Sequence, residues 1–202
     1  MARGVISRLA VLRETGTAGL WQHVQTAPLV GLVALELDQL SKLLVRETVQ
    51  QGQAIPDDSA IRITHVVNPG ILFGAPASPL VSLILPLGMI LAVLAIYWRF
   101  QRSGSTLLNI GTGLFVGGTL GNLLDRIIFG HVTDFIEVVT FGGEVRTIFN
   151  LADVCIIAGI VILEIFLVRH ILRLIRQKGL NYNPVKPVVA GFIRRRFPRQ
   201  KK

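Results

Sequence analysis

Four long apolar stretches constrain this chain more than any other feature of its sequence. They cover residues 27–45, 79–98, 105–124 and 154–172. Each is close to the ~20 residues that a helix needs to cross the hydrocarbon core of a bilayer. A soluble protein could bury such helices in its core, but four of them in 202 residues favour a membrane protein. We therefore expect a mainly α-helical protein with four transmembrane helices, built as a single integral membrane domain over residues 1–202.

The distribution of basic residues predicts which side of the membrane each segment faces. Of the 21 Lys and Arg residues, 16 lie before the first stretch, between the second and third, or from Arg169 onward. Cytoplasmic segments of membrane proteins carry the excess of Lys and Arg. Both termini are therefore expected in the cytoplasm, with residues 173–202 as a basic tail. The loops 46–78 and 125–150 then face outward.

The net charge of +9 raises the question of a nucleic-acid partner. Much of this charge lies in the C-terminal tail, directly after a membrane span. Basic residues near a membrane surface attract anionic lipid headgroups by ~1 kcal/mol each. We therefore expect the tail to contact membrane lipid, and we expect no nucleic-acid partner.

Both outer loops carry β-strand signals. Within residues 61–66, neighbouring side chains alternate weakly between two sets, as they do in a β-strand. Residues 131–139 and 144–149 are two runs rich in residues that favour strands. Gly142 and Gly143 separate these two runs. A Gly-Gly pair between such runs predicts a hairpin. If the two glycines form the turn, the register of the hairpin is fixed. The residue numbers of each facing pair in the two strands then add up to 285.

This hairpin would bring two acidic residues together. In its register Asp134 faces Leu151, and the position opposite Asp153 is Val132. The two aspartates are then diagonal neighbours on one face, roughly 7–8 Å apart at the backbone. The fourth apolar stretch begins nearby, so the pairing is not expected to continue that far unchanged. A separation of 19 residues is nonetheless compatible with two carboxyl groups that meet.

Several other polar residues collect near the predicted outer membrane surface. Charged groups inside a bilayer are costly, so they usually face protein or water and serve a function. Asp38 and Lys42 lie in the outer half of the first stretch, and their i,i+4 spacing predicts an ion pair. The ends of the third and fourth stretches contribute Asn122, Asp125, Arg126, Asn150 and Asp153. We interpret Asp125 with Arg126 as a local ion pair, and we expect Glu164, deep in the fourth stretch, to face protein.

Two carboxylates that share a site cannot both ionise cheaply, so one keeps its proton while the other acts as a base. This arrangement suits the activation of water against an amide carbonyl. Asn150 is a good N-cap, which would place Asp153 at a helix N-terminus and favour its charge. We therefore expect Asp153 to be the ionised member. The alternatives are that Asp153 only caps a helix and that Asp134 is an ordinary surface residue.

Five short motifs occur in order between about residues 27 and 172. They are Asp38-Gln39-Leu40-Ser41-Lys42, Asn68-Pro69-Gly70 with Phe73-Gly74, the run Gly117-Gly118-Thr119-Leu120-Gly121-Asn122-Leu123-Leu124-Asp125-Arg126, Val132-Thr133-Asp134-Phe135, and Phe149-Asn150-Leu151-Ala152-Asp153. In this order they resemble the lipoprotein signal peptidase family, also called signal peptidase II. The chain departs from the family at Ile71 and Leu72, where small residues are usual, which bears on the shape of the substrate cleft.

The resemblance implies an aspartic endopeptidase of the bacterial cytoplasmic (inner) membrane with its active site near the outer face. Such an enzyme removes signal peptides from diacylglyceryl-modified prolipoproteins and cleaves just before the lipidated cysteine. The resemblance also implies a small extracytoplasmic β-sheet around the substrate, no cofactor, and Asp134 and Asp153 as the catalytic residues. The supporting or substrate-binding residues that it implies are Asp38, Lys42, Asn68, Gly70, Asn122, Asp125, Arg126 and Asn150.

Other classes of protein are weighed against this interpretation. A small transporter could relay protons through intramembrane acids, but its acids would be spread across the membrane and not collected at one depth. A presenilin-type protease would carry a Gly-x-Gly-Asp motif, which this sequence lacks. His65 and His131 belong to no HExxH motif or Cys/His cluster, so we expect no metal.

Overall fold

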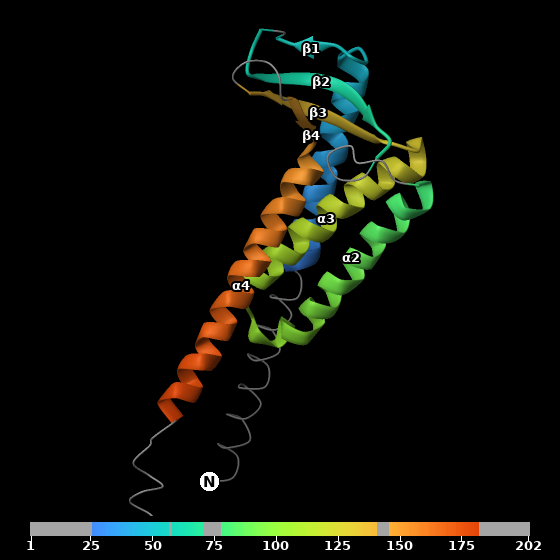
Figure 1. The fold of residues 1–202 in the computed structure, drawn as a ribbon. Coiled ribbons are helices and arrows are strands. Elements are labelled where there is room, and N and C mark those ends of the chain that lie inside the picture. The colour runs from blue at the N-terminus through green and yellow to red at the C-terminus, as the bar shows by residue number, and fades with distance from the viewer. Residues whose placement is uncertain (1–25, 57, 71–77, 141–145, 182–202) are drawn as a thin grey trace, which may run out of the picture. The chain divides into compact units, whose positions relative to one another are not determined.

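The computed structural model describes residues 26–56, 58–70, 78–140 and 146–181 (Figure 1). Several features discussed above therefore lie outside the described residues. They are the segment before residue 26, Ile71 and Leu72, the Gly142-Gly143 turn, and the basic tail beyond residue 181.

Four helices occupy the described parts of the four apolar stretches. The first helix covers residues 26–48 and is drawn in blue in Figure 1. The others are α2 (Pro79–Phe100), α3 (Thr106–Phe129) and α4 (Leu151–Asn181), and a short 3-10 turn, η2 (Gln101–Ser103), follows α2. The prediction of four helices is therefore confirmed, although each helix ends later than predicted.

The membrane character of the helices differs from one to the next. Within the described residues, the segments that are long and apolar enough to cross a membrane are Leu80–Ser103, Thr106–Phe129 and Leu151–Gln177. The first helix is also largely apolar, but it carries Glu36, Asp38 and Lys42 near its middle. In α3 67% of the apolar window is buried, against 11% in α2. Thus α3 lies inside the bundle, while α2 presents apolar side chains to the surroundings, as a lipid-facing helix does.

Helix boundaries follow from capping residues in the sequence. The hydroxyl of Ser78 accepts a hydrogen bond from the backbone N–H of Val81 (3.4 Å), and Pro79 follows at the first helical position of α2. At the other end of α3, Gly130 has φ 78°, a left-handed conformation that glycine adopts without steric cost. The chain can therefore turn sharply from α3 into the strand that follows.

Glycines set the distance between α3 and its neighbours. Gly113, Gly117 and Gly121 recur every four residues, and all three face the first helix. A Cβ atom on Gly117 would collide with the carbonyl oxygen of Gly31, and one on Gly113 would lie 2.6 Å from the carbonyl oxygen of Ala27. Small residues at this spacing let the helix backbones approach closely in lipid.

A four-stranded antiparallel sheet lies at one end of the helices (Figure 1). Its strands, in spatial order, are β1 (Ala54–Ile55), β2 (Ile61–Asn68), β3 (Val132–Val139) and β4 (Arg146–Phe149). Ile136 pairs with Phe149 and Val139 with Arg146, so the numbers of facing residues add up to 285 as predicted. The strand signals at 61–66 and 131–139 are thus confirmed, and so is the part of 144–149 that is described, residues 146–149. The two-residue β1 was not predicted.

By backbone contacts the chain forms two compact units, Met1–Glu164 and Ile165–Lys202. All residues of the sites described below belong to the first unit. Within it, Val45 and Val49 at the end of the first helix form a buried hydrophobic cluster with Phe135 of β3. This cluster attaches the sheet to the helices.

A buried ionic cluster joins the first helix to α3. The Nζ atom of Lys42 lies 2.8 Å from Asp38 Oδ2 and 3.2 Å from Asp125 Oδ2, and it donates a 2.8 Å hydrogen bond to Asn122 Oδ1. The side chains of Asp38, Lys42 and Asp125 have no exposed surface. An ammonium group has three donors, so each N–H of Lys42 has an acceptor. The predicted Asp38–Lys42 ion pair is confirmed.

The same two carboxylates extend the cluster to α4 and β3. Asp38 Oδ1 accepts a 2.8 Å hydrogen bond from the backbone N–H of Ala152 at the start of α4. Asp125 Oδ2 accepts one of 3.0 Å from the backbone N–H of Thr133 in β3. The first N–H groups of a helix have no partner inside the helix, and Asp38 supplies one. The cluster therefore fixes four elements against one another.

Two expectations about acidic residues were wrong. Asp125 pairs with Lys42 and Arg46, and not with the adjacent Arg126, because successive residues of a helix point in different directions. Glu164 is exposed and does not face protein. The neighbouring Leu163 lies on the buried side of α4 instead.

We predict that Lys42→Met strongly destabilises the protein. The substitution keeps an unbranched chain but leaves Asp38 and Asp125 buried without the ammonium group. Removing one partner of a buried ion pair costs about 3–5 kcal/mol. The apparent unfolding temperature in detergent should fall well below that of the wild type. The control is Arg146→Met, because Arg146 also belongs to an ion pair but its side chain is 60% exposed. This substitution should change the unfolding temperature little. A Lys42→Met variant as stable as the control would contradict the role of the cluster.

Candidate active site

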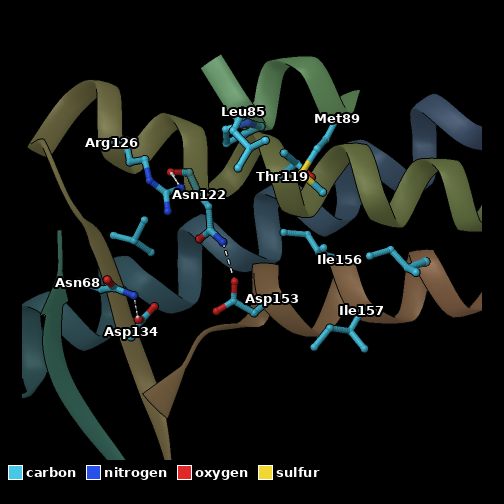
Figure 2. A pocket seen from close by; sticks show the side chains of 13 residues that line it. Asn68, Leu85, Met89, Thr119, Asn122, Arg126, Asp134, Asp153, Ile156 and Ile157 are labelled. Carbon is cyan, nitrogen blue, oxygen red and sulfur yellow. Dashed lines mark hydrogen bonds between the residues drawn. The ribbon is translucent and has the colours of Figure 1, made fainter. Parts of the chain in front are cut away.

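A cavity of about 150 Å³ lies between β2, β3, α2, α3 and α4 (Figure 2). One part of its wall is polar and is formed by Asn68, Asn122, Arg126, Asp134 and Asp153. The rest is mostly apolar and comes from Leu85, Pro86, Met89, Thr119, Val132, Ile156, Ile157 and Ile160. Both predicted catalytic aspartates thus line one cavity.

Asp134 lies in β3 and is held by two asparagines. Asn68 Nδ2 donates to Asp134 Oδ2 (2.8 Å), and Asn150 Nδ2 donates to Asp134 Oδ1 (2.6 Å). Asn68 pairs with Val132 in the antiparallel ladder, so its side chain is a diagonal neighbour of Asp134 on the same face of the sheet. The Asp134 residue is only 3% exposed. It is therefore not an ordinary surface residue.

Asp153 lies in the first turn of α4, as predicted. Asn150 Oδ1 accepts from the backbone N–H of Asp153 (3.0 Å), and Asp153 Oδ2 accepts from the backbone N–H of Asn150 (3.3 Å). This reciprocal pair is a capping box, with Asn150 as the N-cap. Asn122 Nδ2 also donates to Asp153 Oδ1 at 2.8 Å, as the dashed line in Figure 2 shows. Asp153 therefore does more than cap the helix, because it also faces the cavity.

Asn150 connects the two aspartates. Its buried side chain donates to Asp134 through Nδ2 and accepts from the backbone of Asp153 through Oδ1. The ladder between β3 and β4 ends at Ile136 and Phe149, so the extrapolated pairing of Asp134 with position 151 does not occur. The carboxyl groups approach the same cavity because the chain changes from strand to helix at Asn150.

Asn122 links the ionic cluster to this pair. Its Oδ1 atom accepts from Lys42 Nζ (2.8 Å) and from Asn150 Nδ2 (3.0 Å). Lys42 can only donate, so its ammonium group fixes which end of the amide is oxygen. The Nδ2 of Asn122 is then directed at Asp153. Lys42 thereby orients a hydrogen bond that it does not itself make.

Arg126 supplies positive charge at the polar wall of the cavity. It donates to the carbonyl oxygen of Asn122 (3.1 Å) and to that of Gly70 (3.0 Å). The backbone N–H of Gly70 in turn donates to Asn68 Oδ1 (2.9 Å). Arg126 therefore holds Gly70, two residues after the end of β2, near Asn68 and Asp134. All ten predicted site residues thus belong either to the cavity and its hydrogen-bond partners or to the ionic cluster behind it.

Some residues of the site were not predicted. Arg46 lies 3.6 Å from Asp125 Oδ1 and donates to Thr133 Oγ1 (3.1 Å), and Gln39 donates to the carbonyl oxygen of Gly121 (3.1 Å). The sequence could have indicated Arg46 as part of the site, because Arg46 lies four residues after Lys42 on the same helix face. The sequence also indicates part of the apolar wall. In α2 and α4 it places apolar lining residues four positions apart, Leu85 with Met89 and Ile156 with Ile160.

The surroundings of Asp134 favour its protonated form. Burial raises the pKa of its carboxyl group from an ordinary value of 3.8 to about 6. The hydrogen bonds from Asn68 and Asn150 and the charge of Lys42 act against this rise in pKa, whereas the negative charge of Asp153 adds to it.

Among the described residues, no group of three or more His, Cys, Asp or Glu side chains could hold a metal ion. The site therefore offers acid–base chemistry by two carboxyl groups that line one cavity.

Comparisons with known proteins agree with this arrangement. The model of a family described as signal peptidase (SPase) II matches residues 30–169. A lipoprotein signal peptidase of Moorella thermoacetica is 34% identical over 136 residues, which are 67% of this chain and 87% of that protein. One of Dehalococcoides mccartyi is 37% identical over 153 residues, with 72% of this chain and 87% of that protein covered.

A solved structure described as a bacterial membrane enzyme has the same fold. It superposes with a TM-score of 0.63 at 24% identity, and the match covers 72% of this chain and 89% of that chain. The family match covers well over half of the sequence, and the curated relatives exceed 30% identity over most of their own length. The chain belongs to the lipoprotein signal peptidase family, the signal peptidase II group of aspartic peptidases.

Proposed function

We propose that this protein removes signal peptides from diacylglyceryl-modified prolipoproteins and cleaves just before the lipidated cysteine. The observation that carries the proposal is that Asp134 and Asp153, from a strand and from a helix, line one cavity and share Asn150 as a partner. The relatives to which the chain is similar are named lipoprotein signal peptidases, which supports the substrate class.

The two aspartates take different roles because their environments differ. Asp153 accepts from Asn122 Nδ2 and from the backbone N–H of Asn150 at the N-terminus of α4. In both contacts a carboxyl oxygen of Asp153 is the acceptor. Asp134 has a raised pKa of about 6 because of its burial. We therefore assign the general acid to Asp134, whose carboxyl group has the raised pKa, and the general base to Asp153.

The reaction then follows from the positions of the two groups. Asp153 takes a proton from a water molecule, whose oxygen attacks the scissile carbonyl carbon, while Asp134 gives its proton to the carbonyl oxygen. In the tetrahedral intermediate that forms, Asp134 recovers a proton from one hydroxyl group. Asp153 passes its proton to the amide nitrogen of the cysteine. The C–N bond breaks, and both aspartates return to their starting states.

The membrane setting suits a lipid-linked substrate. The apolar wall of the cavity, including Leu85, Met89 and Ile156, can receive an apolar segment next to the two carboxyl groups. The distribution of basic residues supports cytoplasmic termini and a site near the outer face of the inner membrane. It also supports contact of the basic tail with anionic lipid. Unwound substrate backbone is tolerated at such a depth only beside protein or water, and the cavity provides protein groups.

We predict that Asp134→Asn and Asp153→Asn each lower cleavage by at least about 10²–10⁴-fold, the usual contribution of a proton-transferring side chain. The measurement is the rate at which purified protein converts a diacylglyceryl prolipoprotein to its shorter product. Asp58→Asn, at an exposed acidic residue outside the cavity, is the control and should cleave at the wild-type rate. Wild-type turnover by either of the first two variants would exclude the two-carboxylate mechanism.

We also predict that Asp134 makes stability depend on pH. Its pKa is about 6 in the folded protein and 3.8 when unperturbed, so the folded state holds this proton more tightly. The stability that this proton contributes is fully present below about pH 4 and is lost as the pH rises through about 6. Relative to Asp134→Asn, the free energy of unfolding of the wild type should fall by about 3 kcal/mol over this range. Unfolding temperatures of both proteins from about pH 4 to pH 7 test this. Parallel curves would show that the carboxyl group is not buried as described.

A further inference from the structure

The pairing between β2 and β3 is interrupted next to the candidate active site. Ile63 pairs with Ile136, and the next pair along the ladder is Val66 with Asp134. Between these two pairs β2 has two residues and β3 has only one. This is the arrangement of a β-bulge, which bends a strand locally and can direct a side chain to a different face. The reaction proposed above gives this bulge no role.

The bulge decides on which face of the sheet Asn68 lies. Successive residues of a strand point to opposite faces, so a shift of one residue in register exchanges the faces. If the register before the bulge continued, Asn68 would lie opposite His131, on the face away from Asp134. With the bulge, Asn68 pairs with Val132 instead. Its Nδ2 atom therefore reaches Asp134 Oδ2 at 2.8 Å, as Figure 2 shows.

The two bulge residues, Thr64 and His65, are attached to the turn between the first helix and β1. Thr64 Oγ1 donates to the carbonyl oxygen of Gln53 (2.7 Å), and the backbone N–H of Gly52 donates to the carbonyl oxygen of His65 (2.9 Å). His65 Nδ1 lies 3.0 Å from the carbonyl oxygen of Val49. A carbonyl oxygen can only accept, so Nδ1 is the donor. Neither bulge residue lines the cavity.

The side chain of His65 distinguishes the two registers. Its acceptor, Val49, is buried in the hydrophobic cluster with Phe135, the residue of β3 opposite the bulge. In a regular ladder His65 would lie opposite Asp134, on the cavity face, and would lose the bond to Val49. The hydrogen bond from Nδ1 is therefore made only in the bulged register, and it stabilises that register.

Thr64 does not distinguish the registers. In the regular ladder it would lie opposite Phe135, on the same face that it occupies with the bulge. Its hydrogen bond to Gln53 can therefore form in both cases. The two bulge residues thus form a matched pair, in which each bonds to the same turn and only His65 depends on the register.

We propose that His65 is a positioning residue for the peptidase reaction. By stabilising the bulge it keeps Asn68 on the cavity face, where Asn68 holds the carboxyl group of Asp134. His65 acts through these two residues and does not touch the substrate. The inference rests on the proposed function, because it assigns His65 a part in that reaction.

The dependence of prolipoprotein cleavage on pH tests the proposal. His65→Leu removes the donor, and leucine suits the apolar cavity face to which residue 65 would turn. We expect kcat/KM to fall at least about fivefold, which corresponds to the loss of one hydrogen bond. The bond from Asn68 lowers the pKa of Asp134, so its loss should move the alkaline limb of the kcat/KM profile to higher pH. His65→Phe, which keeps a planar ring without the donor, should behave in the same way.

Two further variants separate positioning from a general effect on stability. His65→Asn places an amide donor near the position of Nδ1 and should restore both the rate and the pH profile. Thr64→Val loses a buried hydrogen bond to the same turn, so it should lower the unfolding temperature but keep the wild-type pH profile. A shift of the alkaline limb in Thr64→Val as large as that in His65→Leu would overturn the proposal.

A double-mutant cycle shows whether His65 acts through Asn68. Asn68→Ala removes the contact with Asp134 directly. If His65 acts only through that contact, adding His65→Leu to Asn68→Ala should change kcat/KM by less than about twofold, because residues that act through one contact are not additive. Effects of the two substitutions that multiply would overturn the proposal.

Failure of this inference differs from failure of the proposed function. Wild-type kcat/KM and an unchanged pH profile in both His65→Leu and His65→Phe, with Asp134→Asn inactive, would overturn only the role of His65. Turnover by Asp134→Asn at the wild-type rate would instead contradict the peptidase mechanism itself.

Discussion

The structure depends on one ammonium group that has no contact with water. Lys42 places its charge between Asp38 and Asp125 and its third donor on Asn122. Each of these acceptors leads to another element: Asp38 to the start of α4 and Asp125 to β3. A buried charge is tolerated only when it is paired and hydrogen-bonded, so these elements must meet in one arrangement. The position of the candidate active site follows from that requirement.

The asymmetry of the two aspartates has the same origin. Lys42 fixes the amide of Asn122, which then donates to Asp153, and the backbone N–H of Asn150 donates to the same carboxyl group. Asp134 lies deeper in the sheet and has a raised pKa. The fold therefore gives the two carboxyl groups of the cavity different hydrogen-bond partners, and it raises the pKa of Asp134 by burial.

Local patterns in the sequence predicted the local parts of the structure. Apolar length gave the helices, the Gly-Gly pair gave the register of β3 and β4, and Asn150 was recognised as an N-cap. The partner of Asp125 was wrongly predicted, because its true partner, Lys42, lies 83 residues away in the sequence. The cavity of the candidate active site could not be derived, because its wall is assembled from five elements and no local pattern states which of their side chains meet. The motif resemblance identified the aspartates, while their hydrogen-bond partners required coordinates.

Asn150 is both the first cap of the last helix and a ligand of Asp134. The start of that helix and the surroundings of Asp134 consequently depend on the same side chain. A chain without α4 and its cap would lack both Asn150 and Asp153, so it would lose one of the two carboxyl groups of the cavity and the side chain that donates to the other.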